Sequence, residues 1–362
     1  MLHKCFTLTM LIAFLSVQIV HAKIWRVNNN VGITADFTSF SNAANAASVV
    51  AGDTLHIEAS ATPYVTGNFT LTKRLIVIGV GYFLDPLNPT IPGNAGLQAT
   101  TQSSVIEIFN IGNGANGSKF LGVTFENGPY LNASVPALNL VFEKCLFSDF
   151  FSLYLNDAGS FNGITVRKCI LNADQSFKGQ GAASVVTNLI IENNIFLQGG
   201  FDYQGLTGPS NIFRNNSINA TSAPYNFSNI YIANNIFGNV LSFTFTNTIV
   251  KNNLFTANPV LPGGAAGNLV NVNLANVYVG GGTGSLDSRM QLKTPLASNP
   301  AFQAGLTVGA VVTPNAGAFG GPDPYKLSGI PNIPSIYTLT VPSAIPAGST
   351  SMNASISTRN NN

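Results

Sequence analysis

Charged residues are scarce in this sequence. Asp, Glu, Lys and Arg make up 8% of the 362 residues, about a third of the share in a typical soluble protein. The 16 basic and 14 acidic residues give a net charge of +2, so the chain lacks the positive field that would hold a nucleic acid or an anionic membrane. Because 45% of the residues are hydrophobic, intrinsic disorder is also excluded. The composition predicts a compact protein that is polar but nearly uncharged.

Long apolar runs are missing after the first 22 residues. Residues 1–22 are typical of a secretory signal peptide, with Lys4 ahead of an apolar run from Phe6 to Val20 and small residues at the end. We expect cleavage before Lys23 and export to the extracellular space or the outer cell surface. A membrane anchor is the alternative, but polar residues interrupt the run, and no later stretch offers 18 continuous apolar residues. We therefore expect no membrane insertion of the mature chain.

Cysteine and histidine are rare enough to exclude two classes of active site. Without residues 1–22, His56 is the only histidine, and Cys145 and Cys169 are the only cysteines. A four-ligand zinc site of His and Cys cannot form from this set, and a Ser-His-Asp triad would depend on His56 alone. His56 lies in the alternating pattern Thr-Leu-His-Ile, which predicts a strand and a structural role for this side chain.

An internal repeat organises the middle of the chain. Seven segments align without gaps, and their starts are 22, 24, 25, 22, 19 and 18 residues apart. They are FLGVTFE from Phe120, FEKCLFS from Phe142, VRKCILN from Val166, IENNIFL from Ile191, FRNNSIN from Phe213, IANNIFG from Ile232 and VKNNLFT from Val250. A period of about 20 residues with short Phe-rich and β-branched runs is typical of a solenoid of parallel strands. We predict an all-β parallel solenoid of about ten coils.

The aligned columns predict where each side chain lies. The first and sixth columns are apolar in every segment, so both should face the interior and stack at about 4.8 Å. The four Asn residues of the fourth column should form an internal ladder at a corner, where Asn tolerates the left-handed backbone of a sharp turn. The members of this column are Val123, Cys145, Cys169, Asn194, Asn216, Asn235 and Asn253. The second column alternates in charge through Glu143, Arg167, Glu192 and Arg214, which predicts ion pairs on the outer face.

The two cysteines of the fourth column leave two alternatives open. Adjacent coils would bring the α-carbons of Cys145 and Cys169 to about 5 Å, inside the range of a disulfide. Side chains in register on parallel strands point the same way, however, and would strain that bond. Two stacked free thiols that pack as small apolar groups are the favoured alternative.

The repeat resembles the right-handed parallel β-helix superfamily that includes pectate lyases and related secreted carbohydrate-active proteins. The resemblance covers residues 24–330 and includes an upstream Ala-rich stretch, from about Ser39 to Ser48, followed by the strand pattern that contains His56. The segment GAFGGPDPY from Gly317 is also similar to the closing coil of repeat proteins secreted by Bacteroidetes-type bacteria.

Both open ends of such a solenoid need a cover, because unpaired strand edges promote aggregation. We expect a helix from about Ser39 to Ser48 to cover the first edge, and residues beyond about Pro259 to cover the other. The predicted organisation is a signal peptide at 1–22, a β-helix at 23–320 and a Pro-rich strap and tail at 321–362.

The resemblance implies that a site, if present, lies on the outward face of a sheet or in the loops beside it. Carboxylates follow the core segments in adjacent coils at Asp149, Asp174 and Asp202, and such a group can hold a Ca2+ ion. A cation that bridges a uronate would acidify the proton α to its carboxylate, and Lys178 could abstract that proton if its pKa were lowered. This arrangement resembles a Ca2+-dependent polysaccharide lyase. Capping of turns by the Asp residues is the structural alternative.

Three functions remain open from the sequence. Tyr154, Tyr203 and Tyr225 lie near the same segments, and aromatic rings suit the faces of sugars. Since titratable groups are few, we expect a monomeric, non-catalytic module that presents a polar, aromatic-bearing face to a polysaccharide or cell-surface glycan. The Ca2+-dependent lyase and a structural envelope or matrix protein are the alternatives. The tight Asp pairs of polygalacturonase-like enzymes are missing, so hydrolysis is disfavoured. The fold alone does not choose among these functions.

Overall fold

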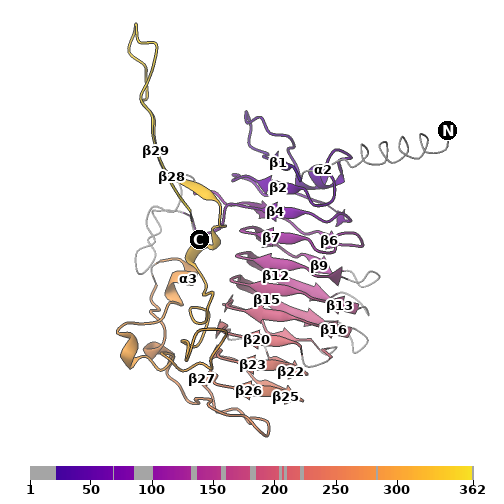
Figure 1. The fold of residues 1–362 in the computed structure, drawn as a ribbon, viewed down its shortest axis with the longest axis vertical. Coiled ribbons are helices and arrows are strands. Elements are labelled where there is room, and N and C mark those ends of the chain that lie inside the picture. The colour runs from indigo at the N-terminus through magenta and orange to yellow at the C-terminus, as the bar shows by residue number, and fades with distance from the viewer. Residues whose placement is uncertain are drawn as a thin grey trace, which may run out of the picture.

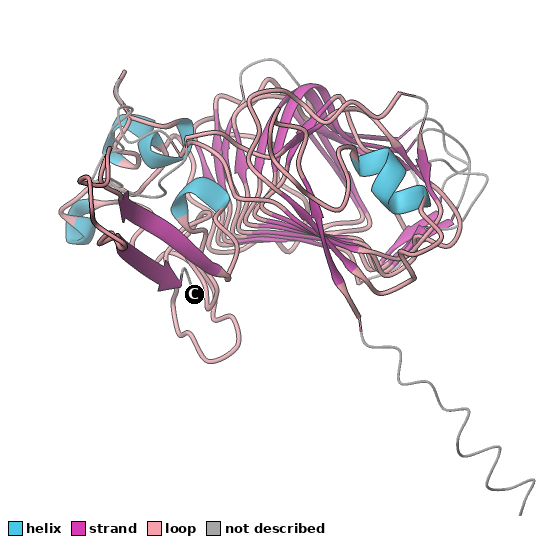
Figure 2. Ribbon diagram, turned by 90° about the horizontal axis from the view of Figure 1, so that it is seen from above, coloured by secondary structure: helices cyan, strands magenta, loops and turns pink. Residues whose placement is uncertain are grey.

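The computed structural model is an elongated parallel β-helix with additional chain packed along one side (Figure 1). It describes residues 22–67, 69–84, 101–131, 137–155, 160–179, 185–203, 206–207, 210–220, 224–282 and 284–360. Along the long axis, the strands of successive coils lie over one another, and the C-terminal part forms a separate layer beside them (Figure 2). The predicted fold class, a right-handed parallel β-helix, is confirmed.

The first sheet contains ten parallel strands, in the order β1-β2-β4-β7-β11-β14-β17-β20-β23-β26. Its strands are β1 (Ile24–Val27), β2 (Thr54–Ile57), β4 (Ile76–Ile78), β7 (Lys119–Leu121), β11 (Val141–Glu143), β14 (Thr165–Arg167), β17 (Ile190–Glu192), β20 (Ile212–Arg214), β23 (Tyr231–Ala233) and β26 (Ile249–Lys251). The register pairs the same repeat position in every coil, for example Phe120 with Phe142 and Phe142 with Val166. The alignment of the repeats in the sequence is therefore the alignment of the coils in space.

The second sheet has 14 strands, which fall into two parts along each coil. After the corner it contains β5 (Val105–Ile106), β8 (Thr124–Glu126), β12 (Leu146–Leu155), β15 (Ile170–Gly179), β18 (Ile195–Phe196), β21 (Ser217–Asn219), β24 (Ile236–Gly238) and β27 (Leu254–Phe255). It continues through β3 (Thr70–Leu71), β6 (Asn110–Ile111), β9 (Tyr130–Leu131), β19 (Phe201–Asp202), β22 (Tyr225–Ser228) and β25 (Phe243–Thr246). The long strands β12 and β15 run through both parts. A small third sheet contains β10 (Ala137–Leu138), β13 (Ser160–Asn162) and β16 (Val185–Thr187).

About seven complete coils form the regular part of the helix. Each aligned segment gives a strand of the first sheet, a corner and a strand of the second, from β7–β8 to β26–β27. The strands β1, β2 and β4 extend the first sheet but lack this fixed spacing to a second-sheet strand. The prediction of about ten coils matches the strands of the first sheet and is too high for complete turns.

The first and sixth columns form the core, as predicted. All fourteen of their side chains, from Phe120 to Phe255, are at most 1% exposed. Like rings stack from coil to coil, with centroids 5.1 Å apart for Phe120 and Phe142 and 5.0 Å apart for Phe237 and Phe255. Burial of each such side chain contributes roughly 1.5–3 kcal/mol, and an aromatic pair adds about 0.5–1.5 kcal/mol.

Both ends of the helix are covered. The helix α2 (Phe40–Asn45) is capped by Ser39, whose side chain accepts a hydrogen bond from the Asn42 amide, and it buries Phe40 against the first coils. It is shorter than the stretch predicted from Ser39 to Ser48. At the other end, Ala266 and Leu269 form bridges with the last coil, as expected for residues beyond Pro259.

The C-terminal part then returns along the side of the helix. It contains the short helices η1 (Leu274–Asn276), α3 (Leu286–Arg289), η2 (Leu296–Ser298) and η3 (Leu327–Gly329). Beyond them, β28 (Pro334–Thr340) and β29 (Ser355–Asn360) form an antiparallel pair that extends away from the body (Figure 1).

Side chains of the third repeat column hold residues 304–332. From here on, the strap means these residues and not the range 321–362 used in the sequence analysis. Asn252 donates to the Ala304 carbonyl at 2.9 Å, and Asn193 donates to the Ala318 and Gly320 carbonyls at 3.0 and 2.7 Å. Further along, Lys168 pairs with Asp323 at 2.5 Å, and Lys144 donates to the Ile330 carbonyl at 3.0 Å. The strap therefore runs from the last coils toward the first.

Candidate functional site

The third column, and not the fourth, takes the left-handed backbone at the corner. Positive φ angles of 52–60° occur at Lys144, Lys168, Asn193, Asn215, Asn234 and Asn252. The prediction that placed this conformation in the fourth column was wrong by one residue. The left-handed residue lies at the corner where the chain passes from the first sheet into the second. The side chains of the fourth column, which follow it, are all buried.

The fourth column forms the internal ladder that the sequence suggests. Each amide nitrogen donates to the next amide oxygen, with distances of 3.0 Å from Asn194 to Asn216, 3.0 Å from Asn216 to Asn235 and 2.9 Å from Asn235 to Asn253. Asn253 continues the ladder to Asn268 at 3.0 Å. The sequence alignment missed this last member because it lies outside the seven segments. Since the amides bond to one another and to backbone, the ladder is structural.

Cys145 and Cys169 belong to the same ladder and carry free thiols that are fully buried. The Cys145 amide donates to the Cys169 sulfur at 3.3 Å, and the Cys169 amide donates to the Asn194 oxygen at 2.9 Å. Burial raises the pKa of the Cys169 thiol well above its usual value, so this thiol is unreactive. Of the two alternatives, the structure contains the stacked thiols.

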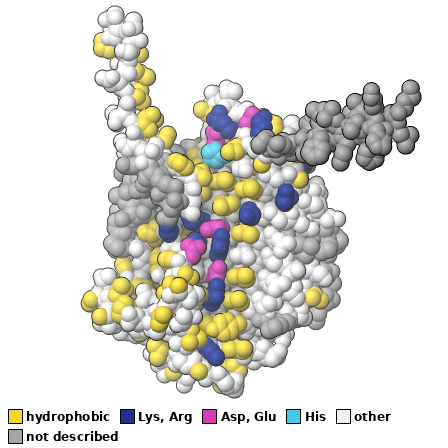
Figure 3. Space-filling model, viewed as in Figure 1, with side chains coloured by type: hydrophobic (Ala, Val, Ile, Leu, Met, Phe, Trp, Pro, Cys, Tyr) yellow, Lys and Arg dark blue, Asp and Glu magenta, His cyan; other side chains and the backbone are white. Residues whose placement is uncertain are grey.

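The second column carries the expected ion pairs on the outer face of the first sheet. Arg167 contacts Glu143 at 2.8 Å, and Arg214 contacts Glu192 at 2.7 Å. In the space-filling view, acidic and basic side chains follow one another in a narrow stripe across this face (Figure 3). The carboxylate of Glu143 holds the pKa of Arg167 above its usual value, against the effect of burial. These charges are mutually compensated, so they offer no catalytic group.

A different line of residues crosses the outside of the second sheet. The register joins Asn110, Tyr130, Tyr154, Lys178, Asp202, Asn226 and Thr244, one from each successive coil. We call this set the outer column. Neighbouring positions such as Leu131 and Phe201 are fully buried, whereas Tyr130 and Asp202 are partly exposed. The alternation of strand side chains therefore directs the described members of the outer column away from the core.

The outer column brings together three residues that the sequence singled out. Tyr154, Lys178 and Asp202 occupy consecutive register positions on β12, β15 and β19. Asp202 accepts a hydrogen bond from the Asn226 amide at 3.3 Å. The side chains of Tyr154 and Lys178 lie outside the described part. Tyr130 was missed, although the dipeptides Tyr130-Leu131 and Tyr154-Leu155 mark the same position in adjacent coils.

Two predicted sugar-contacting residues do not lie on the surface. Tyr203 is 2% exposed and Tyr225 is 0% exposed, so the assignment of these rings to a glycan was wrong. Both rings lie on the same inward face as Phe201. Tyr225 is in register with Phe201, and Tyr203 lies two residues after Phe201, so its side chain points to the same side of the sheet. They pack in the aromatic core, where the Tyr203 ring contacts Phe177 at a centroid distance of 5.8 Å.

The predicted calcium ligands do not share one register position. Asp149 pairs with Ala173 rather than with Asp174, and Asp202 pairs with Lys178. The side chains of Asp149 and Asp174 lie outside the described part, so the calcium site stays a prediction. Among the described residues, no group of three or more His, Cys, Asp or Glu side chains could hold a metal ion.

One carboxyl that the sequence did not single out for chemistry is deeply buried. Asp287, at 0% exposure, accepts hydrogen bonds from the Ser328 amide at 2.7 Å and from the Tyr325 hydroxyl at 3.1 Å. Tyr325 in turn contacts the Tyr82 hydroxyl at 2.8 Å. Burial raises the pKa of Asp287. Because the group is closed to solvent and links α3 to the strap, we regard it as an anchor of the strap.

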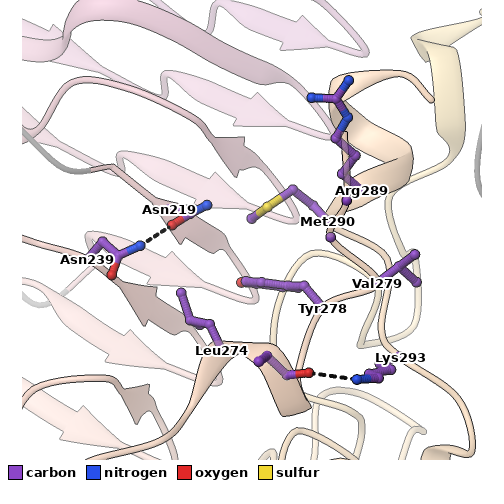
Figure 4. A pocket seen from close by; sticks show the side chains of 11 residues that line it. Asn219, Asn239, Leu274, Tyr278, Val279, Arg289, Met290 and Lys293 are labelled. Atoms are coloured by element: carbon purple, nitrogen blue, oxygen red, sulfur yellow. Dashed lines mark hydrogen bonds between the residues drawn. The ribbon is translucent and has the colours of Figure 1, made fainter. Parts of the chain in front are cut away.

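A cavity of about 430 Å³ lies between the second sheet and the C-terminal part. Asn219 and Asn239 form one wall, and Tyr278, Met290 and the cations Arg289 and Lys293 form the other (Figure 4). The Asn239 amide donates to the Asn219 oxygen at 2.7 Å. No pattern in the sequence indicates this cavity, because its opposite walls come from segments without a common repeat.

Comparison with known proteins adds no family assignment. A scan against protein-family models found no match, and a search of curated proteins found no significant match. Within the described ranges, no helix is long and apolar enough to cross a membrane.

Proposed function

We propose that this protein is a secreted or surface-associated β-helix module that binds a polysaccharide or cell-surface glycan along its outer column. The observation that carries the proposal is the sequence of side-chain types at consecutive register positions: two Tyr positions, then Lys178, Asp202 and Asn226. In the second and fourth columns, by contrast, side chains of adjacent coils pair with one another, as Glu143 does with Arg167 and Asn194 with Asn216.

The geometry of the outer column suits an extended chain of sugar units. Parallel strands place successive positions about 4.8 Å apart on a rigid surface, so little conformational entropy is lost on binding. Tyr130 is partly exposed, and a ring at this position offers an apolar face with a polar tip. Asp202 and Asn226 offer acceptors and donors for hydroxyl groups.

The proposal also includes export from the cell and a relationship to the superfamily that the repeat resembles. Residues 1–22 have the composition of a signal peptide, and the repeat resembles the pectate-lyase-like superfamily of secreted β-helices. A scaffold of this kind, with few titratable groups, supports binding without catalysis. We propose that the monomer is the binding unit, because the outer column lies within one chain.

A glycan panel tests the proposal with a matched pair of variants. Tyr130→Ala removes a ring from the outer column, and Tyr231→Ala removes a partly exposed ring from β23 of the first sheet. We expect Tyr130→Ala to weaken binding of the recognised glycan at least about tenfold, while Tyr231→Ala leaves it unchanged. Equal effects of the two variants would refute binding at the outer column.

The same panel separates the alternatives. Ultraviolet absorbance of an unsaturated product, dependent on Ca2+, would identify the predicted lyase and contradict a purely binding role. The absence of both product and binding for every glycan would leave the structural envelope or matrix protein.

A further inference from the structure

A buried carboxylate lies at the first edge of the helix. Asp53 directly precedes β2 and is 1% exposed. Its oxygens accept hydrogen bonds from the Lys23 amide at 2.9 Å, from the Trp25 indole at 2.8 Å and from the Val50 amide at 3.0 Å. Burial acts to raise the pKa of Asp53, but these hydrogen bonds outweigh it and lower the pKa below its ordinary value. The carboxylate is therefore ionised at neutral pH.

This buried charge has no cationic partner as long as residues 1–22 are attached. Within the described ranges, no Lys, Arg or His side chain forms an ion pair with Asp53. The ammonium group of Lys23 lies over the Trp25 ring, 3.3 Å from the ring centroid. The three donors that reach Asp53 are neutral N–H groups. A desolvated carboxylate in such surroundings is costly unless a cation compensates it.

Cleavage before Lys23 would supply that cation. Ala22 and Lys23 are both exposed, so the bond between them is open to an export peptidase. Hydrolysis consumes one water: the C–N bond breaks, the water oxygen completes the new Ala22 carboxylate, and the two protons of the water convert the Lys23 N–H to an ammonium group. The nitrogen that gains the charge is the atom that already lies 2.9 Å from the Asp53 Oδ1 atom.

We propose that removal of residues 1–22 creates an ion pair between the α-ammonium group of Lys23 and the carboxylate of Asp53, and that this pair fixes β1 to β2. The inference rests on the export that is part of the proposed function. The Lys23 carbonyl accepts from the Thr54 amide at 2.8 Å, and β1 pairs with β2 over its whole length. A charge-assisted hydrogen bond is roughly twice as strong as a neutral one, so processing strengthens the attachment of the first strand.

NMR titration of the Lys23 α-amino group tests the ion pair in the mature chain, residues 23–362, with 13C-labelled lysine. We expect the pKa of this group to lie at least about one unit above its ordinary value of about 7.7–8.0. Asp53→Asn should return the pKa to that ordinary value. Asp36→Asn removes an exposed carboxylate from the same end of the helix and should leave the raised pKa unchanged. An ordinary pKa in the wild-type mature chain would overturn the inference.

A second chain tests the attachment of β1 with Asp53 in place. A Gly-Ser dipeptide added before Lys23 keeps the Lys23 N–H but moves the terminal charge two residues away. We expect the Thr54 amide, which donates to the Lys23 carbonyl, to exchange with solvent hydrogen about tenfold faster in this chain than in the mature chain. Equal exchange rates in the two chains would overturn the inference.

N-terminal sequencing of the protein recovered outside the producing cell separates the ion pair from export. A terminus at Lys23 supports both. Export with a different first residue would overturn the ion pair and leave export intact, and a chain that stays inside the cell with residues 1–22 attached would overturn both. An ordinary α-amino pKa in an exported chain that begins at Lys23 would contradict the ion pair alone.

Discussion

The fourth-column ladder and the outer column cross many of the same coils at the same spacing, yet they differ in burial and chemistry. Asn194, Asn216 and Asn235 are fully buried, and each receives or gives the same hydrogen bonds as its neighbours. The outer column changes from Tyr to Lys to Asp to Asn and is open to solvent at its described side chains. Repetition in a solenoid thus reports packing, and a varied exposed column is the better place to seek recognition.

The largest difference between the columns should appear on removal of a ladder amide. Asn216→Ala deprives Asn194 of its acceptor and removes the donor to Asn235, so buried groups lose their partners. We expect the free energy of unfolding to fall by about 3 kcal/mol. Asn162→Ala, which breaks an exposed amide pair with Asn188, should cost less than about 0.5 kcal/mol. Denaturant titration of both variants measures the contrast, and equal losses would mean that the ladder contributes no special stability.

A smaller effect is expected next to the ladder, at Lys144 in the third column. Burial and the neighbouring Lys168 lower the pKa of Lys144 to about 8, from 10.5. Between these two values the unfolded chain binds more protons than the folded chain, so stability should rise with pH from about 8 toward 10. We expect a gain on the order of 1 kcal/mol after allowance for solvent screening.

The Lys144→Met variant provides the control for this pH dependence. Denaturant titration of both proteins across the same pH range gives the free energy of unfolding as a function of pH for each, and the two dependences are compared. A wild-type curve parallel to that of the variant would show that Lys144 is not desolvated by the strap.

The charged second column should contribute less than either corner column. Glu192→Gln removes the 2.7 Å ion pair with Arg214 on the partly exposed face of the first sheet. We expect a loss of about 0.5 kcal/mol that disappears in high salt. Thermal unfolding at low and high ionic strength measures it. A loss that persists in high salt would point to packing by the side chain and not to its charge.

The smallest change in stability is expected in the outer column. Asp202→Ala removes a partly exposed side chain whose described hydrogen bond is the 3.3 Å contact with Asn226, so stability should stay within about 0.5 kcal/mol of the wild type. Binding of the recognised glycan should nevertheless weaken about threefold or more. A loss of stability comparable to that of Asn216→Ala would erase the distinction between the two columns.

The sequence predicted those features that recur in every coil. The core columns, the ion pairs and the ladder from Asn194 to Asn253 follow from alignment, because in-register stacking repeats each local environment. The predicted position of the left-handed residue was wrong by one. Positions 193 and 194 are both Asn, and Asn can either take the left-handed backbone or join the amide ladder. In two coils the left-handed residue is Lys144 or Lys168. Residue type does not predict this conformation there, because Lys is not among the residues that favour it.

Features outside the repeat needed the structure. The burial of Tyr203 and Tyr225 depends on which residues of the region from Phe201 to Tyr225 face inward, and this region lies between the aligned core segments. The cavity and the path of the strap join residues far apart in sequence, such as Asn219 with Lys293 and Lys144 with Ile330. No local pattern specifies such contacts.

The strap makes the length of this solenoid a fixed quantity. A repeat protein can gain or lose a coil by duplication or deletion, because each coil contacts only its neighbours. Here one continuous segment binds the corner from Asn252 to Lys144, so one added coil would displace every anchor beyond it by one strand spacing. A change in coil number would have to be matched by a change in the length of the strap. The strap therefore restricts the number of coils that this chain can have.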